Sequence, residues 1–408
     1  MCGITGFYIQ GKDYKRSNLN ENLYEMTNSL SHRGPDDIGT WLNLNNNIGL
    51  GQTRLSIRDL SKNGSQPMFS ACGNYIIVYN GEIYDNNKIK SLLEKKNIRL
   101  KSSSDTELLL ENISNFGLDS ALENSNGMFA FALFDIKKKK LFLIRDRMGI
   151  KPLFYYQNNN NFAFASEIKA LKKFLNFKSS LNVDALNSFL KYGFNRNYSS
   201  IYQNIKQVKP GEIIEIDQNL IIKKKLYWKT NNFFKDIKNN TSLSENINEL
   251  ENLIKDAVKI RLESDVEVGS FLSGGIDSSL ISQVMSEVSE KKINTFSVGF
   301  IEKDYDESRD AREIAKYIGS NHHEILIGEK ELLNVFDNLP NIYDEPFADS
   351  SQIPTAIVSN YARKYAGVIL SGDGGDELFG GYTRYLEAKK QIDKKEDIEI
   401  KLKKKSEE

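Results

Sequence analysis

The sequence predicts two domains of different class, an α+β domain in its first half and an α/β domain with a parallel sheet in its second half. In the first half, short apolar runs alternate with turn signals and a few helical patterns, as expected for layered sheets and helices. In the second half, apolar strands alternate with amphipathic helices, as expected for a parallel sheet covered on both faces. A polar stretch at 229–244, rich in Asn and Lys and without periodicity, is the predicted linker.

Composition narrows the class of protein. The 408 residues predict two or three domains, and 55 Lys and Arg residues balance 55 Asp and Glu residues, so nucleic acid is not an expected partner. The two cysteines, Cys2 and Cys72, exclude a disulfide framework, and we expect Cys72 to be a small core residue. No apolar run approaches the ~18 residues that span a bilayer. No secretory signal opens the chain, so we expect a cytoplasmic protein without a membrane partner.

Apolar periodicity places several elements of the first half. A short strand covers 3–10, and the helix that follows has Asn20 as its expected N-cap. A strand at 75–79 runs into the motif at 80–84, and Ser104 is placed to cap the start of another helix. Further strands are expected at 128–135, 141–146 and 162–166, and a helix at 182–192 with Leu186, Phe189 and Leu190 facing inward and Gly193 as its C-cap.

The start of the chain, Met1-Cys2-Gly3, could supply a catalytic nucleophile. Aminopeptidases remove an initiator Met before a small side chain, which would leave a thiol and a free α-amino group on Cys2. The thiolate is the nucleophile, and the amine, with an ordinary pKa of about 7.7–8.0, can take the proton. One residue would then supply both nucleophile and base. The dipeptide alone favours an ordinary cysteine near a terminus, so the reactive interpretation depends on the rest of the sequence.

Two glycine-rich loops follow predicted strands in the second half. A strand at 266–272 leads into Ser273–Ser279, which opens a helix, and the second loop at 371–382 contains several carboxylates. Ligands of parallel sheets bind at the carboxyl ends of strands, where backbone N–H groups can wrap a pyrophosphate. The first loop lacks the Gly-Lys-Ser/Thr of a Walker A loop, and the carboxylates of the second suit Mg²⁺. Other strands are expected at 295–300, 324–327 and 367–370, and helices at 244–261, 307–318 and 354–365.

Six motifs of the first half occur together in order. They are Cys2-Gly3-Ile4, His32-Arg33-Gly34-Pro35-Asp36, Arg54-Leu55-Ser56-Ile57, Asn80-Gly81-Glu82-Ile83-Tyr84, Ser104-Asp105-Thr106-Glu107 and Arg145-Asp146-Arg147-Met148-Gly149-Ile150-Lys151-Pro152-Leu153. The series resembles the glutaminase domain of class II glutamine amidotransferases, the N-terminal-nucleophile type. The resemblance covers residues 2–215 and implies a four-layer αββα fold that hydrolyses glutamine to glutamate and ammonia.

The resemblance also assigns roles. Cys2 would attack the glutamine side-chain carbonyl with its own α-amine as general base. The Asn80 side-chain amide and the Gly81 backbone N–H would stabilise the oxyanion of the tetrahedral intermediate. Three charged residues would hold the substrate. Arg54 would bind the α-carboxylate through two parallel hydrogen bonds, and Glu82 and Asp105 would bind the α-ammonium.

His32 and Arg33 receive a structural interpretation, as a buried anchor of their loop.

The second half resembles N-type ATP pyrophosphatases, of the adenine nucleotide α-hydrolase-like fold. Together the halves resemble glutamine-hydrolysing asparagine synthetases over about residues 2–388, with an ATP-binding domain at 245–388 and a charged tail at 389–408. The implied reaction adenylates the β-carboxylate of aspartate, and ammonia delivered through an internal tunnel then displaces AMP. The implied ATP-binding residues are Leu272, Ser273, Gly274, Gly275, Asp277, Ser278, Val298, Ser371 and Gly372, and the implied Mg²⁺ ligands are Asp277 and Asp376.

The second domain also departs from this family. Asp373 stands where some members carry a Glu as a presumed base, and the segment 344–351 is expected to border the acceptor amino acid. Family members usually continue further and carry a catalytic Lys there, so we expect an intact glutaminase attached to an incomplete, impaired synthetase domain. Two alternatives stay open: an amidotransferase for another carboxylate, such as a sugar acid or peptide-like precursor, and a glutaminase or non-catalytic protein that needs a partner chain. A homodimer is one assembly that the resemblance allows.

Overall fold

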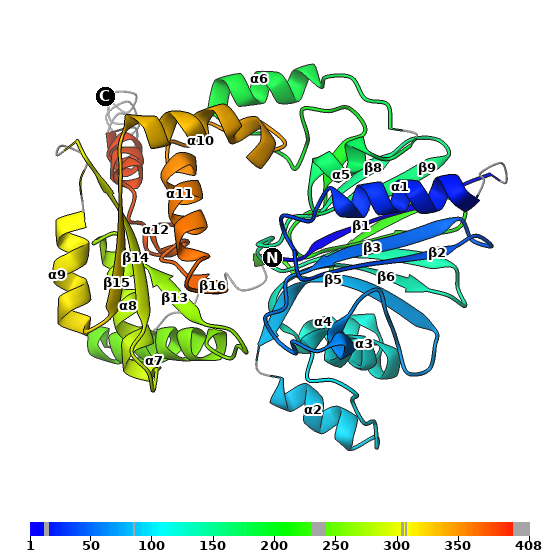
Figure 1. Cartoon of the computed structure of the whole chain (residues 1–408), viewed down its shortest axis with the longest axis horizontal. Helices are drawn as coiled ribbons and strands as arrows, with labels where there is room; N and C mark the ends of the chain where they lie inside the picture. The colour runs from blue at the N-terminus through cyan, green and yellow to red at the C-terminus, as the bar shows by residue number, and fades with distance from the viewer. Residues whose placement is uncertain are drawn as a thin grey trace, which may run out of the picture. The chain divides into compact units, whose positions relative to one another are not determined.

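The computed structural model describes residues 1–11, 16–84, 86–175, 177–230, 242–302, 306 and 308–394. Most of the predicted linker at 229–244, and most of the predicted tail at 389–408, lies outside these residues. The chain divides into two compact units (Figure 1). Unit 1 comprises Met1–Ser242, Glu263–Val266 and Asn334–Ile353, and unit 2 comprises Leu243–Leu262, Glu267–Leu333 and Pro354–Glu408. Two short segments of the second half of the sequence therefore belong to unit 1.

Two antiparallel sheets of six strands each form the centre of unit 1. The first sheet has the order β10 (Ile205–Gln207), β8 (Phe154–Gln157), β9 (Asn161–Ala165), β1 (Gly3–Ile9), β3 (Ile48–Arg54) and β2 (Asp37–Asn43). The second has the order β12 (Ile222–Leu226), β11 (Glu212–Ile216), β7 (Lys140–Arg145), β6 (Asn126–Asp135), β5 (Tyr75–Tyr84) and β4 (Met68–Phe69).

The two sheets pack face to face through an apolar core. Ile4 of β1, Val78 of β5 and Phe134 of β6 are fully buried in one cluster that draws on both sheets. The Phe134 ring lies 6.0 Å from the Tyr8 ring and 6.1 Å from the Trp41 ring, so aromatic contacts cross between the layers.

Helices cover both outer faces of this sandwich (Figure 1). On the first sheet, Leu23 and Met26 pack beside Phe7, and on the second, Leu109 packs beside Phe131. These contacts give four layers in the order αββα and confirm the predicted fold of the first domain. The helices are α1 (Arg16–Asn28) and α5 (Ile168–Lys172) on the first sheet, and α2 (Asn87–Glu94), α3 (Asp105–Phe116) and α4 (Leu118–Asn124) on the second; unit 1 also contains η1 (Lys62–Gly64) and α6 (Val183–Tyr192).

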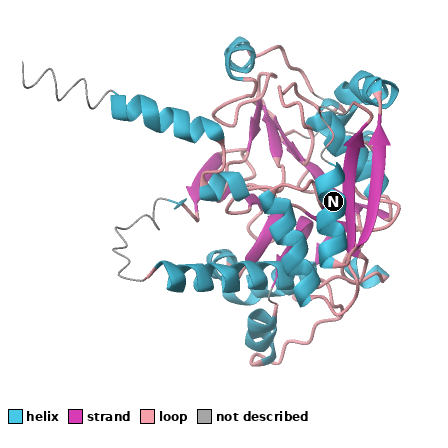
Figure 2. Cartoon of the chain, turned by 90° about the vertical axis from the view of Figure 1, so that its left-hand side faces the viewer, coloured by secondary structure: helices cyan, strands magenta, loops and turns pink. Residues whose placement is uncertain are grey.

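Unit 2 contains a parallel sheet with helices on both faces (Figures 1 and 2). Val258 and Met285 cover one face, and Val358 and Ala362 cover the other, so the predicted α/β class is confirmed. The sheet has the order β15 (Asn321–Ile327), β14 (Asn294–Phe300), β13 (Val268–Phe271) and β16 (Val368–Leu370). The helices are α7 (Leu243–Arg261), α8 (Ile276–Val288), α9 (Ser308–Ile318), α11 (Gln352–Ala362), α12 (Gly375–Phe379) and a helix at 383–394, and α10 (Glu329–Ile342) leads into the unit 1 segment.

Several predicted boundaries are wrong. Asn20 is inside α1 rather than at its N-cap, because the buried face of the helix already begins at Leu19. The motif 80–84 does not follow a strand but continues β5, because its pairing with β6 runs to Tyr84. In α6, Leu190 is 72% exposed rather than inward, whereas Gly193 does end the helix in the left-handed conformation.

Phe134→Ala should be among the most costly substitutions in unit 1. It removes a fully buried ring from between the sheets, and we expect a loss of about 3–5 kcal/mol in the free energy of unfolding. Urea unfolding followed by Trp fluorescence measures it, with the exposed Phe194→Ala as the matched control. A loss as small as that of the control would contradict the described packing.

Candidate functional site

Cys2 lies at the end of β1, beside the end of β3. The register pairs Gly3 with Thr53, which places Cys2 at the level of Arg54 and close to Leu55. Its Sγ accepts a hydrogen bond from Leu55 N at 3.4 Å. Burial raises the pKa of the Cys2 thiol, and the hydrogen bond from Leu55 offsets part of this effect. A thiol of raised pKa needs a nearby base to act as a nucleophile.

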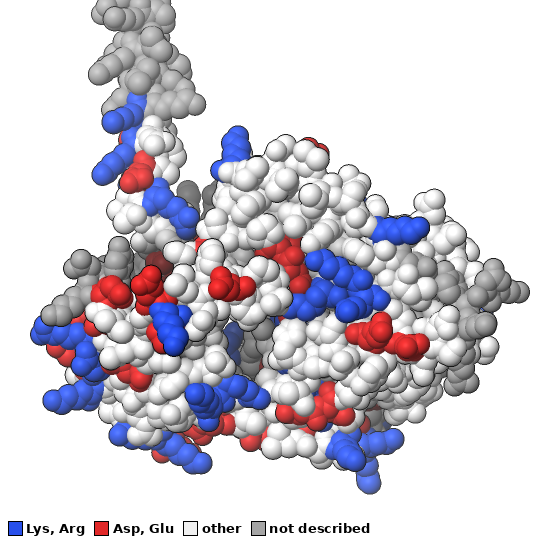
Figure 3. Space-filling view, turned by 45° about the horizontal axis from the view of Figure 1, so that its top comes forward, with Lys and Arg blue, Asp and Glu red and all other residues white. Residues whose placement is uncertain are grey.

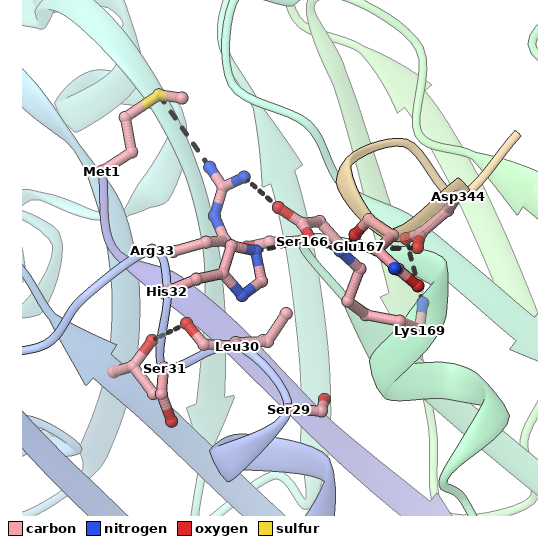
Figure 4. Close-up of polar contacts among 12 residues, drawn as sticks. Met1, Ser29, Leu30, Ser31, His32, Arg33, Ser166, Glu167, Lys169 and Asp344 are labelled. Carbon is pink, nitrogen blue, oxygen red and sulfur yellow. Dashed lines mark hydrogen bonds and ion pairs between the residues drawn. The ribbon is translucent and has the colours of Figure 1, made fainter. Parts of the chain in front are cut away.

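An ion-pair cluster around Glu167 lies near the start of the chain (Figure 4). Arg33 Nε donates to Cys2 O at 3.0 Å, and its Nη1 contacts Glu167 Oε1 at 2.5 Å. His32 Nε2 and Lys169 Nζ lie 2.9 and 3.0 Å from Glu167 Oε2. Burial would raise the pKa of Glu167, but His32, Arg33 and Lys169 outweigh it and lower the pKa to about 2. Arg33 is a buried anchor as predicted, whereas the His32 side chain is 50% exposed, so that part of the prediction is wrong.

The cluster continues into the segment Asn334–Ile353. Asp344 Oδ2 accepts from Lys169 N at 2.9 Å, and Glu345 Oε1 accepts from Ile201 N at 2.7 Å. The first two carboxylates of the predicted acceptor-bordering segment 344–351 therefore fix this segment to unit 1. A role beside an acceptor amino acid stays a prediction.

Asn80 is buried with an unsatisfied side chain. It is 1% exposed, and neither its Nδ2 nor its Oδ1 has a hydrogen-bond partner among the described residues. Leaving such a group unpaired costs about 1–3 kcal/mol, and a structure retains that cost where a ligand supplies the partner. The Asn80 amide is thus available to an incoming oxygen.

Gly81 follows in the same strand, opposite Phe129 of β6. Phe129 N donates to Asp146 Oδ2 and Phe129 O accepts from Asp146 N, so both backbone groups of Phe129 face β7. Gly81 and Phe129 therefore form a non-hydrogen-bonded pair, in which the Gly81 N–H points away from β6. An added Cβ at Gly81 would lie 2.5 Å from Met128 O, so close strand packing also requires glycine here.

Two buried carboxylates lie near this strand. Asp105 Oδ2 accepts from Tyr79 Oη at 2.9 Å and from Ile83 N at 3.0 Å. Burial raises the pKa of Asp105, and burial and the charge of Asp105 raise the pKa of Glu82 to about 8. The charges of Glu82 and Asp105 also raise the pKa of the Cys2 thiol. The strand and the helix N-terminus therefore bring together two carboxyl groups whose ionised forms a cationic group of a ligand would stabilise.

Arg54 holds the loop that follows β3. Its Nη1 donates to Ser61 O at 2.8 Å, and its Nη2 donates to the carbonyl oxygens of Asp59 and Arg58. The terminal nitrogens of Arg54 therefore bind this turn, and the role of Arg54 in binding the substrate α-carboxylate stays a prediction.

Sequence reasoning missed two cations of this region. Arg58 Nε lies 3.4 Å from Glu82 Oε2. Lys151 is 5% exposed, and its pKa is lowered, first by burial and then by the charge of Arg33, while Glu82 and Cys2 act in the opposite direction. Lys151 stood inside a quoted motif and could have been named from it, whereas no local pattern singles out Arg58. The prediction of Cys72 as a core residue is wrong, because Cys72 is exposed beside Ser70 and Ser114.

The glycine-rich loops of unit 2 meet at one edge of the parallel sheet. They follow the neighbouring strands β13 and β16, which pair through Ser270 and Leu370. An added Cβ would lie 2.5 Å from Asp277 Cγ at Gly375, and 2.8 Å from Ser278 N at Gly372, so the backbone of one loop rests on the other. Ser273–Ser279 leads into α8 as predicted.

The first loop presents hydroxyl groups at the start of a helix. Ser273 Oγ lies 3.0 Å from Ser278 Oγ, and Gly275 at the N-cap of α8 offers no capping side chain to the first turn. Both features suit an anionic ligand at the helix N-terminus. Leu272 is 1% exposed beneath α9, so a contact with a nucleotide falls to its backbone, and Val298 lies half-buried on β14.

Asp277 and Asp376, the predicted Mg²⁺ ligands, lie on the two loops. Among the described residues, no group of three or more His, Cys, Asp or Glu side chains could hold a metal unaided. Two carboxylates still fit Mg²⁺, which commonly takes its remaining oxygens from phosphates and water. Asp373 Oδ2 accepts from Ser371 Oγ at 2.9 Å within the second loop.

Comparison with known proteins connects both units to one family. The glutamine amidotransferase domain family matches residues 1–228, and the asparagine synthase family matches residues 249–408. A Methanocaldococcus jannaschii protein named asparagine synthetase (glutamine-hydrolysing) 2 is 41% identical over 407 residues, which cover 95% of this chain and 76% of that protein. The chain belongs to the glutamine-hydrolysing asparagine synthetase family. The family predicted from the motifs, and its class of glutamine-hydrolysing ligase, are confirmed.

Relatives within this asparagine synthetase family carry more than one name. Asparagine synthetase (glutamine-hydrolysing) 1 of Bacillus subtilis is 36% identical over 387 residues, covering 95% of this chain. Amidase chry2 of Gibberella zeae is 30% identical over 411 residues, covering 94% of this chain. The chain spans 60% of the length of each of these two proteins.

Glu167→Gln should destabilise unit 1 in a pH-dependent way. The depressed pKa means that Glu167 stabilises the fold above its unfolded pKa of about 4.5, and that this stabilisation is lost as the pH falls through about 2. We expect a loss of about 2 kcal/mol at neutral pH after discounting for solvent screening. Thermal unfolding as a function of pH measures it. An equal difference between the proteins at neutral and strongly acidic pH would contradict the ion-pair account.

Proposed function

We propose that unit 1 hydrolyses glutamine with Cys2 as the nucleophile. The observation that carries this proposal is the unsatisfied, buried Asn80 amide on a strand whose neighbouring carboxylates, Glu82 and Asp105, act on the Cys2 thiol. A thiol, an oxyanion donor and a pair of carboxyl groups for the α-ammonium are parts that hydrolysis of an amino acid amide requires.

The chemistry follows from the residue positions. The chain as described carries Met1, so its removal must precede catalysis and expose the Cys2 α-amine. That amine takes the thiol proton as Sγ attacks the amide carbon, and Asn80 Nδ2 and the Gly81 N–H stabilise the oxyanion. Proton return to the leaving nitrogen releases ammonia and leaves a thioester, which water hydrolyses to glutamate. Glu82 and Asp105 bind the substrate α-ammonium, and Arg54 binds its α-carboxylate.

We infer that unit 2 uses ATP and aspartate. The loop Ser273–Ser279, with Leu272, Val298, Ser371 and Gly372, would hold the nucleotide at the strand ends. Asp277 and Asp376 would hold Mg²⁺, which neutralises charge on the pyrophosphate. Attack of the aspartate β-carboxylate on the α-phosphorus releases pyrophosphate, and ammonia then displaces AMP to form asparagine.

The remaining expectations have more general support. In the described ranges, no helix is both long and apolar enough to cross a membrane. On the face drawn in Figure 3, basic and acidic side chains are interspersed, which favours small-molecule substrates over a polyanion. A cytoplasmic location fits the free Cys2 and Cys72, and a homodimer stays a prediction.

The name of the Gibberella zeae relative favours one second candidate, amide formation on an acceptor other than aspartate. The glutaminase chemistry would be unchanged, and the acceptor would decide between the two functions. A panel of carboxylic acids assayed for ATP-dependent pyrophosphate release distinguishes them.

Cys2→Ala should separate the two reactions. We expect glutamate release to fall at least about 10³-fold, because the nucleophile is absent. The rate of asparagine formation from ATP, aspartate and added ammonium, however much the expected impairment of unit 2 lowers it, should equal that of the parent protein. Cys72→Ala is the matched control and should leave glutamate release unchanged. Glutamate release by Cys2→Ala at the wild-type rate would refute the glutaminase, and pyrophosphate release with every acceptor except aspartate would refute asparagine synthesis.

Glutamine binding should strengthen as the pH rises towards 8. The pKa of Glu82 is raised to about 8, so a substrate whose α-ammonium selects the ionised form of Glu82 releases a proton on binding below that pH. We expect the Kd for glutamine, measured by calorimetry in the Cys2→Ala protein, to fall about tenfold between pH ~6.5 and ~8. Adding Glu82→Gln should remove this dependence, and its persistence there would refute the assignment to Glu82.

A further inference from the structure

The loop after β3 carries a buried cation that the proposed reaction does not use. Arg58 lies four residues beyond Arg54, and its side chain is 10% exposed. Its Nη1 donates to Ile83 O at 3.1 Å, and its Nε lies 3.4 Å from Glu82 Oε2. The Arg58 guanidinium therefore meets the strand that carries the glutamine-site carboxylate.

Two residues of the connection between α7 and β13 hold the other side of this loop. Arg58 Nε donates to Glu263 O at 3.0 Å, and its Nη2 donates to Glu263 Oε2 at 3.1 Å. Asp265 N donates to Ile57 O at 2.9 Å, and Asp265 Oδ2 accepts from Asp59 N at 2.8 Å. These bonds flank Arg58 on both sides along the chain and fix its backbone as well as its guanidinium.

The same loop also reaches the second carboxylate of the site. Asp59 Oδ2 accepts from Ser103 N at 2.9 Å, just before the N-cap residue Ser104 of the helix that begins with Asp105. Arg58 and Asp59 thus connect the α7–β13 connection to both strand β5 and helix α3. A loop with bonds on three sides is suited to holding charges in a set geometry.

We propose that Arg58 is a positioning residue for glutamine binding, which orients Glu82 towards the substrate α-ammonium while Glu263 and Asp265 hold Arg58 in place. This inference rests on the proposed glutaminase function of unit 1. Arg58 Nε, Nη1 and Nη2 all donate to protein groups. Arg58 therefore acts on the substrate through Glu82 and not by direct contact. The residues that hold it belong to the chain leading into β13, which ends at the predicted nucleotide loop.

The surroundings of Glu82 make this role measurable. Asp105 opposes ionisation of Glu82, whereas Arg58, Lys151 and the α-amino group of the chain favour it, with Arg58 the strongest of the three. Removing the Arg58 charge should therefore raise the pKa of Glu82 further, by about one unit. The titratable and charged groups that act on or with Glu82 are Arg58, Tyr79, Asp105, Lys151, the α-amino group and Cys2.

The pH dependence of glutamine binding tests the proposal. In the Cys2→Ala protein, Arg58→Gln should move the midpoint of the Kd profile upward by about one pH unit and weaken binding near pH 7 about tenfold. Arg58→Lys, which retains the charge, should keep the midpoint close to that of the parent. Arg99→Gln, the same substitution at an exposed arginine of unit 1, should change neither quantity.

A structural role alone would weaken binding without moving the midpoint. Arg58→Met provides a second neutral variant, and circular dichroism confirms that each protein is folded. An unmoved midpoint in both neutral variants would overturn the proposal. If the parent binds no glutamine, the proposed function fails, and the ¹³C carboxyl titration of Glu82, assigned through Glu82→Gln, then decides separately whether Arg58 acts on Glu82. An Arg58→Gln protein with an unchanged Glu82 pKa overturns the proposal in that case.

Discussion

The pairing of β1 with its two neighbours is the constraint on which the candidate site depends. β1 runs antiparallel between β3 and β9, with Gly3 opposite Thr53 and Thr5 opposite Ala165, and all seven of its residues are buried. A slip by one residue would turn every buried side chain of the strand to the opposite face. The register therefore fixes how far Cys2 extends beyond the sheet. The strand pairing does not include Cys2 itself. Cys2 is held instead by Arg33, which donates to Cys2 O and forms an ion pair with Glu167.

Charge in the site is arranged around groups that are unsatisfied without a ligand. The Asn80 amide lacks a partner among the described residues, and Glu82 and Asp105 are buried together with raised pKa values. Both features cost folding free energy, and one amino acid amide can offset both costs. Its oxyanion would accept a hydrogen bond from Asn80, and its α-ammonium would pair with Glu82 and Asp105. The stability that the sandwich core supplies, through residues such as Phe134, allows the chain to retain these costs.

The sequence predicted the fold class and the components of the site more successfully than their geometry. Ser104 and Gly193 were recognisable as helix caps because capping is a local property. The extension of β5 through 80–84 was not, because it depends on pairing with β6, about 45 residues away in the chain. Arg58 was missed for a similar reason, since its partners Glu82 and Glu263 come from remote segments. The segments Glu263–Val266 and Asn334–Ile353 also join unit 1 without any compositional signal.

The most direct measurement of the central claim is covalent labelling with an electrophilic glutamine analogue, followed by intact-mass analysis and peptide mapping. The account predicts one adduct per chain, located on a Cys2 that has lost Met1, with protection by glutamine. The exposed Cys72 is the internal control and should stay unmodified at equimolar reagent. An adduct on Cys72 alone, or labelling of Cys2 that glutamine does not prevent, would contradict a glutamine-specific nucleophile at the end of β1.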